Sequence, residues 1–240
     1  MMMRSSMASS AVKAASVSHV GGGLGLSSCF GFEGRSNISN RKTNTDSSRQ
    51  FSSSVHKHSL QRIAVKRLDE IVKVPLLKAN PPNEIQRIWE EHHQETVSSV
   101  GHVLPAGEWL MLQDRARRSP MFIYPVSRPS SDSSPRKGFF TLVGQWQDKS
   151  LIFTFLEDFR SSPMTAQPWL AFSAYDELAE EKGLALMRGE FTTRLDKDDV
   201  ENIMNSVRHF YLGDGYRHVE TFNHQPDQFN FSEVFPGIGF

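Results

Sequence analysis

The sequence predicts an α+β fold: a mostly antiparallel central sheet flanked by helices in a single domain, preceded by a disordered transit peptide. The middle of the chain holds short aromatic and β-branched runs separated by turn residues, which is typical of strands. Apolar residues on both sides of this region recur at helical spacing. The first strand candidates follow one another without the long crossovers that parallel strands need, so we expect antiparallel pairing.

Two helices are expected before the sheet. Asn83 can cap the first, over Glu84–Val97, in which apolar residues share one face. The second covers Glu108–Arg117, where apolar residues recur at the same spacing and the cationic end suits a helix C-terminus.

Six later segments have the composition of strands, and turn residues separate them. They are Met121–Tyr124, Gly138–Trp146, Ser150–Phe155, Trp169–Phe172, Leu184–Thr192 and Tyr216–Phe222. The tripeptide Gln147-Asp148-Lys149 is short enough to join the second and third as a hairpin.

Helical segments are also expected among and after these strands. Ser173 can cap a helix over Ala174–Lys182, which Gly183 would end in a left-handed turn. Acidic residues from Asp196 onward favour the start of a longer helix, closed by Gly213. Its apolar stripe comprises Val200, Ile203, Met204, Val207, Phe210 and Tyr211. The segment Pro226–Phe235 is interpreted as a last short helix or turn.

Residues 1–51 have the composition of an organelle-targeting peptide. The segment is rich in Ser. It holds six of the 27 Lys and Arg residues of the chain but only two of the 27 Asp and Glu residues. Transit peptides are Arg-rich, Ser-rich and acid-poor, although a disordered Ser-rich tail is the alternative. Composition leaves chloroplast and mitochondrion open. Arg49-Gln50-Phe51 before Ser52 resembles a mitochondrial cleavage pattern, so we expect cleavage between Phe51 and Ser52.

Residues 52–83 are interpreted as a linker arm, and residues 84–240 as the functional domain. Within the arm, part of Leu60–Val74 has helical spacing and is expected to form a short amphipathic helix that the following prolines stop. The Ser- and Pro-rich segment Arg128–Lys137 is interpreted as a mobile surface loop.

Charge and composition exclude several classes of function. Without the leader, the chain carries 21 basic and 25 acidic residues, a net charge of about −4. Nucleic-acid binding would require clustered Lys and Arg, so we expect no nucleic-acid partner. The single cysteine, Cys29, lies in the leader, so the mature chain has no thiol nucleophile, disulfide or Cys-ligated metal. No apolar run reaches the roughly 18 residues of a spanning helix, and we expect no membrane insertion.

Enzyme chemistry has weak candidates in this sequence. His92 and His93 are adjacent, and adjacent residues on a helix point about 100 degrees apart, so we expect no metal site. Glu190 and Glu220 are possible cleft carboxylates, but a structural ion pair, for example with Arg188, is the favoured interpretation. The chain also lacks a Gly-x-Ser-x-Gly elbow and a phosphate-binding loop. We therefore predict no catalytic residue and no cofactor.

Six blocks of sequence, taken in order, carry a family resemblance. They are EIQRIWEEHH at Glu84–His93, VLPA at Val103–Ala106, RARRSPMFIYPVSR at Arg115–Arg128, FFTLVGQW at Phe139–Trp146, ELAEEKGLALMRGE at Glu177–Glu190 and VETFN at Val219–Asn223. Together they resemble the assembly factor family of the mitochondrial ATP synthase catalytic head, which chaperones the beta subunit. The resemblance runs from about Glu84 to Phe231, and the arm and the Ser- and Pro-rich loop depart from it.

The resemblance implies a chaperone, not an enzyme. As a monomer in the mitochondrial matrix, it would bind the free beta subunit, prevent its aggregation and hand it to the alpha subunit. An organellar enzyme and a general matrix holdase are the alternatives. The residues proposed for partner contact all lie in the matching blocks, where each could instead hold the fold. They are Phe122, Tyr124, Trp146, Met187, Arg188, Phe222 and Asn223.

Overall fold

The computed structural model describes residue 60, residues 63–128 and residues 138–236. Its centre is a six-stranded sheet in the order β1-β6-β5-β4-β3-β2, and every neighbouring pair is antiparallel. The strands are β1 (Ser99–Pro105), β2 (Met121–Arg128), β3 (Gly138–Gln147), β4 (Ser150–Phe155), β5 (Pro168–Tyr175) and β6 (Leu184–Phe191). The predicted α+β class is therefore confirmed. The predicted transit peptide, the Phe51–Ser52 cleavage position and residues 129–137 of the loop lie outside the described residues.

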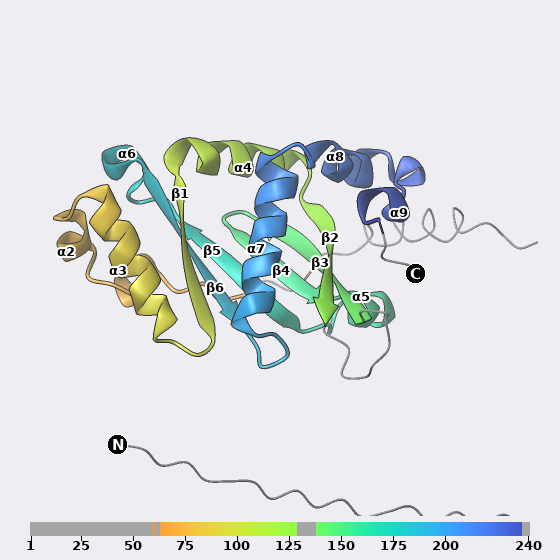
Figure 1. Ribbon diagram of the computed structural model, residues 1–240, viewed down its shortest axis with the longest axis horizontal. Helices are drawn as coiled ribbons and strands as arrows, with labels where there is room; N and C mark the ends of the chain where they lie inside the picture. Colours follow the sequence, from red (N-terminus) through yellow and green to blue (C-terminus); the bar gives the residue numbers. More distant parts are fainter. Residues whose placement is uncertain (1–59, 61–62, 129–137, 237–240) are drawn as a thin grey trace, which may run out of the picture. The chain divides into compact units, whose positions relative to one another are not determined.

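The strands from β2 to β6 form a meander, and β1 joins the sheet beyond β6. Two strands that are consecutive in sequence, β1 and β2, therefore lie at opposite edges. Helix α4 (Ala106–Arg118) connects them and runs along one end of the sheet in Figure 1. Its 13 residues reach about 20 Å, which is comparable with the width of the sheet.

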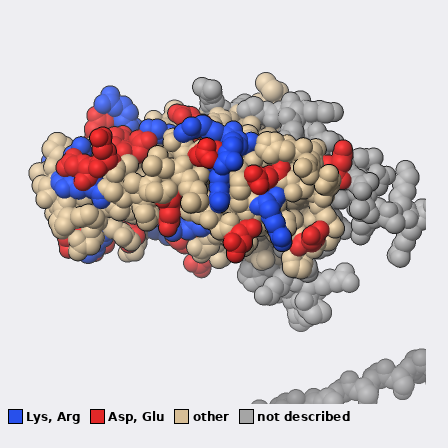
Figure 2. Space-filling view, turned by 90° about the horizontal axis from the view of Figure 1, so that it is seen from above, with Lys and Arg blue, Asp and Glu red and all other residues tan. Residues whose placement is uncertain are grey.

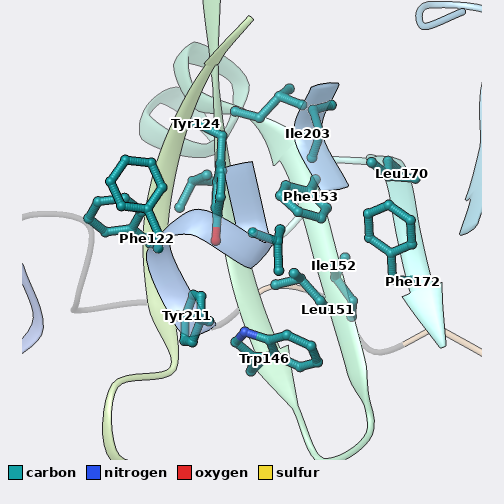
Figure 3. Packing of buried hydrophobic residues seen from close by; sticks show 14 of the residues in the cluster. Phe122, Tyr124, Trp146, Leu151, Ile152, Phe153, Leu170, Phe172, Ile203 and Tyr211 are labelled. Atoms are coloured by element: carbon teal, nitrogen blue, oxygen red, sulfur yellow. The ribbon is translucent and has the colours of Figure 1, made fainter. Parts of the chain in front are cut away.

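The larger core lies on the sheet face that is covered by α4, α7 (Lys197–Leu212) and α8 (Tyr216–His224). Figure 1 shows α7 crossing in front of the sheet between its edge strands β1 and β2. Alternate strand residues point into this core, as the two-residue period of a strand requires. In Figure 3, Tyr124 of β2 lies between Phe122 of β2 and Phe153 of β4, with ring centroids 5.6 Å and 5.1 Å away.

A smaller core lies on the opposite face, at β1 and β6, under helix α3 (Pro82–Gln94). Trp89 of α3 is buried, and its Nε1 donates to the carbonyl of Met187 at 3.1 Å. The 3₁₀-helix Leu68–Glu70 and helix α2 (Val74–Lys78) add Leu68 and Leu77 to this core. A Cβ on Gly101 of β1 would lie 2.7 Å from Nδ1 of His93, so only glycine allows α3 to pack this closely.

Tyr211 of α7 links the three covering helices and the sheet. Its hydroxyl donates to the carbonyl of Ser119 at 2.7 Å, and its own carbonyl accepts from Nη1 of Arg115 at 2.9 Å. The Arg115 guanidinium lies 4.4 Å from the ring centroid of Tyr216 in α8. The Tyr211 ring packs 5.9 Å from that of Trp146 in β3 (Figure 3).

The outward-facing backbone groups of the two edge strands, β1 and β2, have different surroundings. At the β2 edge, Asn223 of α8 accepts from the backbone N–H of Met121 at 3.1 Å and donates to its carbonyl at 2.6 Å. This side chain therefore satisfies the edge as another strand would. Four residues after Met121, Pro125 has no N–H to offer. The β1 edge contains neither feature within Ser99–Leu104.

The predicted strand at Tyr216–Phe222 is wrong, because these residues form α8. Their aromatic and β-branched content suggested a strand. The buried residues, however, are Tyr216, Val219 and Phe222, and a three-residue interval places them on one helical face. Packing against β2 and α7 then decides the structure.

Two elements in the sheet region were not predicted: strand β1 and the short helix α5 (Leu156–Ser161). Gly101 and His102 lower the strand propensity of β1, which is stabilised instead by its seven-residue pairing with β6. The predicted helix Ala174–Lys182 is wrong in its first half, because Ser173–Tyr175 pair with β6. Only α6 (Ala179–Lys182) is helical, and Gly183 ends it in the predicted left-handed conformation, with φ of 70°.

The arm also differs from the prediction. Pro75 lies in the first turn of α2 instead of stopping a helix. Backbone N–H groups in the first turn have no partner within the helix, so proline, which lacks an N–H, is tolerated there. Asn83 lies inside α3, whose N-cap is Pro81. The predicted helices at Glu84–Val97 and Glu108–Arg117 and the helix from Asp196 are confirmed as α3, α4 and α7. The last predicted segment forms a 3₁₀-helix (Pro226–Gln228) and helix α9 (Phe231–Val234).

We predict that Asn223→Ala lowers the free energy of unfolding by about 2 kcal/mol, because two backbone groups of Met121 lose their partners. Urea denaturation followed by circular dichroism measures this loss. Asn205→Ala, on the exposed side of α7, is the matched control and should change stability by less than about 0.5 kcal/mol. Equal stabilities of the two variants would contradict the role given to Asn223.

Candidate partner-binding surface

Five of the seven residues proposed for partner contact point into the larger core. Phe122, Tyr124, Trp146, Met187 and Phe222 are all buried. Figure 3 shows the first three inside the aromatic cluster of the sheet. The Phe122 ring packs edge-on against that of Phe222, at 5.6 Å between centroids. In the folded chain these side chains support the structure from inside.

The other two residues are held by other parts of the chain. Arg188 of β6 is 9% exposed, and its Nη1 lies 2.9 Å from the Glu190 carboxylate. Asn223 is half-buried and is engaged with Met121. Contact of the seven residues with a partner stays a prediction, and their burial favours a binding surface elsewhere. The structural ion pair weighed for Glu190 is present, and Glu220 lies exposed on helix α8.

Helix α4 carries an exposed apolar pair that the sequence reasoning missed. Leu110 is 63% exposed and Met111 is 46% exposed. Within the described part of the chain, they are the only exposed large hydrophobic residues adjacent in sequence. Their neighbours Trp109 and Leu112 fill the core, so α4 is apolar on two sides. A helix buried on one side normally has a polar outer face. The apolar residues on both sides of α4 were therefore the sequence signal that could have indicated an exposed apolar surface.

The rest of the outer face of α4 is charged. Arg117 and Arg118 are exposed at its C-terminal end, and Arg118 pairs with Asp114 at 2.6 Å. Figure 2 views the molecule from the side of α4 and α8, where interspersed charges leave broad uncharged areas. The helix therefore presents apolar side chains followed by basic ones, a surface that suits an apolar partner patch with acidic neighbours.

A groove of about 220 Å³ lies at the β1 edge of the sheet, between the end of α3 and the start of α7. Its floor is Val100–His102, and its walls include Glu90 of α3 and Glu201 of α7. Lys197 also lines it, but its ammonium group donates to the carbonyls of His93 and Gln94. The groove therefore carries two carboxylates against one ammonium group, which keeps its charge.

Two histidines beside this groove are held neutral. Burial, with a smaller contribution from the Arg208 charge, lowers the pKa of His102 to about 4. The pKa of His93 is also lowered, chiefly by burial. Nε2 of His102 lies 3.6 Å from the Glu201 carboxylate, which becomes an ion pair only when the imidazole is protonated. At neutral pH the histidines add polar atoms to the groove but no charge.

A larger cavity, about 550 Å³, lies between the arm and the β3–β4 turn. Lys66 and Arg67 of the arm face Lys149 and Tyr175 across it. The Tyr175 hydroxyl donates to the carbonyl of Lys66 at 3.0 Å and fixes the arm against the sheet. Because acidic residues also line the cavity, it has no strong preference for a charged ligand.

The described residues offer no metal centre or membrane span. Within residues 60, 63–128 and 138–236, no three His, Cys, Asp or Glu side chains cluster closely enough to hold a metal ion. None of the helices in these ranges has the length and apolar composition needed to cross a bilayer.

Comparison with known proteins connects this fold to one family. The sequence model of the ATP11 protein family matches residues 32–235, which includes the arm and part of the predicted transit peptide. The chain is 32% identical over 173 residues to "ATP synthase mitochondrial F1 complex assembly factor 1" of Homo sapiens. The match covers 70% of this chain and 50% of the human protein.

Two further relatives carry the same name. The Mus musculus protein is 32% identical over 70% of this chain and 51% of its own length. The Danio rerio protein is 25% identical over 70% of this chain and 55% of its own length. The chain thus spans about half the length of the curated relatives it matches.

We predict that the protein is less stable at pH 5 than at pH 7, and that His102 contributes about 2 kcal/mol of the difference. Its folded-state pKa lies below the unfolded value, so the unfolded chain binds the proton first. Stability is therefore complete above about pH 6.5 and falls as the pH drops toward 4. His102→Gln should flatten the dependence, measured by urea unfolding at several pH values. The exposed His92→Gln should leave it unchanged.

Proposed function

The chain belongs to the ATP11 protein family, and from that premise we propose that it is an assembly chaperone of the mitochondrial ATP synthase catalytic head. It binds the free beta subunit, prevents its aggregation and hands it to the alpha subunit. It acts as a monomer in the mitochondrial matrix, without a cofactor. The names of the curated relatives support the assembly role.

The exposed apolar pair Leu110 and Met111 is the structural observation that supports this proposal most directly. An unassembled subunit exposes apolar surface that its partner subunit later covers, and such surface aggregates when it is left free. Helix α4 can mask part of it, because Tyr211 and the core residues Trp109 and Leu112 fix the helix to the sheet. Binding of the alpha subunit to the same surface of beta would then displace the chaperone.

Two other functions compete with this proposal. A general matrix holdase would bind many unfolded chains, and the apolar pair on α4 alone would suit that role. An organellar enzyme would need a catalytic carboxylate in a cleft. Glu190 is instead paired with Arg188, and neither Glu190 nor Glu220 lines the cavities described above. The structure gives the enzyme hypothesis no specific support.

A pull-down with the chain starting at Ser52 tests the choice of client. Separately expressed alpha and beta subunits are offered one at a time, and we expect retention of beta alone. Retention of alpha alone, or of neither subunit, would refute the proposal. Suppression of the aggregation of unrelated proteins to the same extent as beta would favour the general holdase.

We further predict that the double variant Leu110→Glu, Met111→Glu retains beta at least about tenfold more weakly. Each buried apolar side chain is worth roughly 1.5 kcal/mol or more, and two new carboxylates oppose burial. Leu76→Glu on α2, where leucine is 64% exposed, is the matched control and should bind normally. Thermal unfolding checks that all variants remain folded. Equal binding by the double variant and the control would exclude α4 as the contact.

A further inference from the structure

Gly107 occupies a position in α4 that the fold itself does not require to be glycine. The helix begins at Ala106, so Gly107 lies in its first turn, where it is exposed. Among the described residues, Gly183 is the only glycine with a positive φ, so the backbone of Gly107 does not need glycine. A Cβ at Gly107 would meet no atom within 4 Å. Glycine disfavours a helix, and here it improves no contact inside the described chain.

The exposed residues of α4 form one stripe that begins at Gly107. At about 100° per residue, positions three, four, seven, ten and eleven after it lie on the same side of the helix. The exposed residues of α4 match this spacing: Gly107, Leu110, Met111, Asp114, Arg117 and Arg118. The stripe therefore extends over about three turns, while the opposite side of the helix is buried against the core.

The first half of the stripe combines an open position with apolar side chains. The distance between two packed helices depends on the side chains at their crossing, so Gly107 permits another backbone to approach closely. One turn later, the exposed Leu110 and Met111 provide apolar contact area, and the flexible Met side chain adapts to the surface it meets. This half of α4 can therefore pack closely against a second element.

Arg117 gives the second half of the stripe a charge that can be paired. It lies seven residues after Leu110, about 10 Å further along the helix and within about 20° of the same direction. Its guanidinium donates to the amide oxygen of Gln113 at 3.0 Å, and no acid within the described residues forms a salt bridge with it. Arg118, by contrast, is paired with Asp114 at 2.6 Å. An acidic side chain of a partner therefore complements Arg117.

A helix is the element that suits this stripe. The middle of α4 bonds its backbone groups within the helix, so the stripe offers side chains and no groups for strand pairing. A partner helix also satisfies its own backbone, and it presents side chains three, four and seven residues apart. Apolar residues and an acid at this spacing match Leu110, Met111 and Arg117.

We propose that a helix of the free beta subunit packs along the outer face of α4 and crosses it at Gly107. Its apolar side chains lie on Leu110 and Met111, and an acidic side chain two turns further along pairs with Arg117. This inference rests on the proposed function and deepens it, because it names the element of the client that is bound. Gly107 sets specificity, since a larger residue there favours α4 itself but holds the client helix away.

Substitutions at Gly107 separate a contact role from a structural one, because affinity and stability should move in opposite directions. Titration of the full chain with purified beta subunit measures the affinity, and thermal unfolding measures the stability. Gly107→Gln should bind beta about tenfold more weakly and melt up to about 2 °C higher. Gly107→Ala should have an intermediate affinity. Gly138→Gln, at the exposed start of β3 where a Cβ also meets no atom within 4 Å, is the matched control and should bind normally.

The outcomes distinguish this proposal from the proposed function. If the parent chain binds beta and Gly107→Gln binds it equally well, the crossing at Gly107 is wrong and the assembly role stands. If the parent chain does not bind beta, both proposals fail. A weaker affinity together with a lower melting temperature would show that the fold itself requires Gly107, which also contradicts the proposal.

Arg117 gives an independent readout. Arg117→Glu should bind beta about fivefold more weakly, because the proposed attraction becomes a repulsion. Arg117→Lys keeps the charge and should bind within about twofold of the parent chain. Thermal unfolding checks that both variants remain folded. Equal affinities of these two variants would refute the acidic contact.

Discussion

The packing of Tyr211 is the constraint on which the arrangement of helices depends. Its hydroxyl donates to the Ser119 carbonyl, its carbonyl accepts from the Arg115 guanidinium, and its ring packs against that of Trp146. These contacts join α7 to the C-terminal end of the connection between β1 and β2 and hold it against the sheet. Burial raises the pKa of Tyr211 well above its usual value, so the phenol stays a hydrogen-bond donor at any physiological pH. Together with the buried Trp109 and Leu112, Tyr211 fixes the position of α4 and thereby of Leu110 and Met111.

The sequence was sufficient to predict the class of the fold and most long elements. Helices α3, α4 and α7 have regular apolar stripes, and β2 to β6 have strong strand composition, so local signals agreed with tertiary packing. Prediction failed where long-range contacts outweighed local preference. β1 forms because β6 offers it a complete ladder, although Gly101 and His102 are poor strand residues. Tyr216–Phe222 is a helix because its buried residues are three apart, a spacing that its strand-like composition concealed.

The candidate site was harder to predict than the fold, for a physical reason. The blocks that carried the family resemblance are rich in Phe, Tyr and Trp, and large side chains of this kind fill cores as often as they form contacts. Phe122, Phe222 and Trp146 are buried accordingly. A candidate binding surface is instead indicated by side chains that stay apolar while exposed, such as Leu110. Which side of α4 packs on the sheet depends on tertiary contacts, which a single sequence does not reveal.

The two-sided helix α4 links the proposed client contact to complete folding of the chaperone itself. Its inner residues Trp109 and Leu112 are buried against the core, whereas Leu110 and Met111 stay exposed on the same helix. In an incompletely folded chain all four side chains would be exposed together, and the helix would present apolar surface on every side. The selective surface proposed for the client therefore exists only in the finished fold.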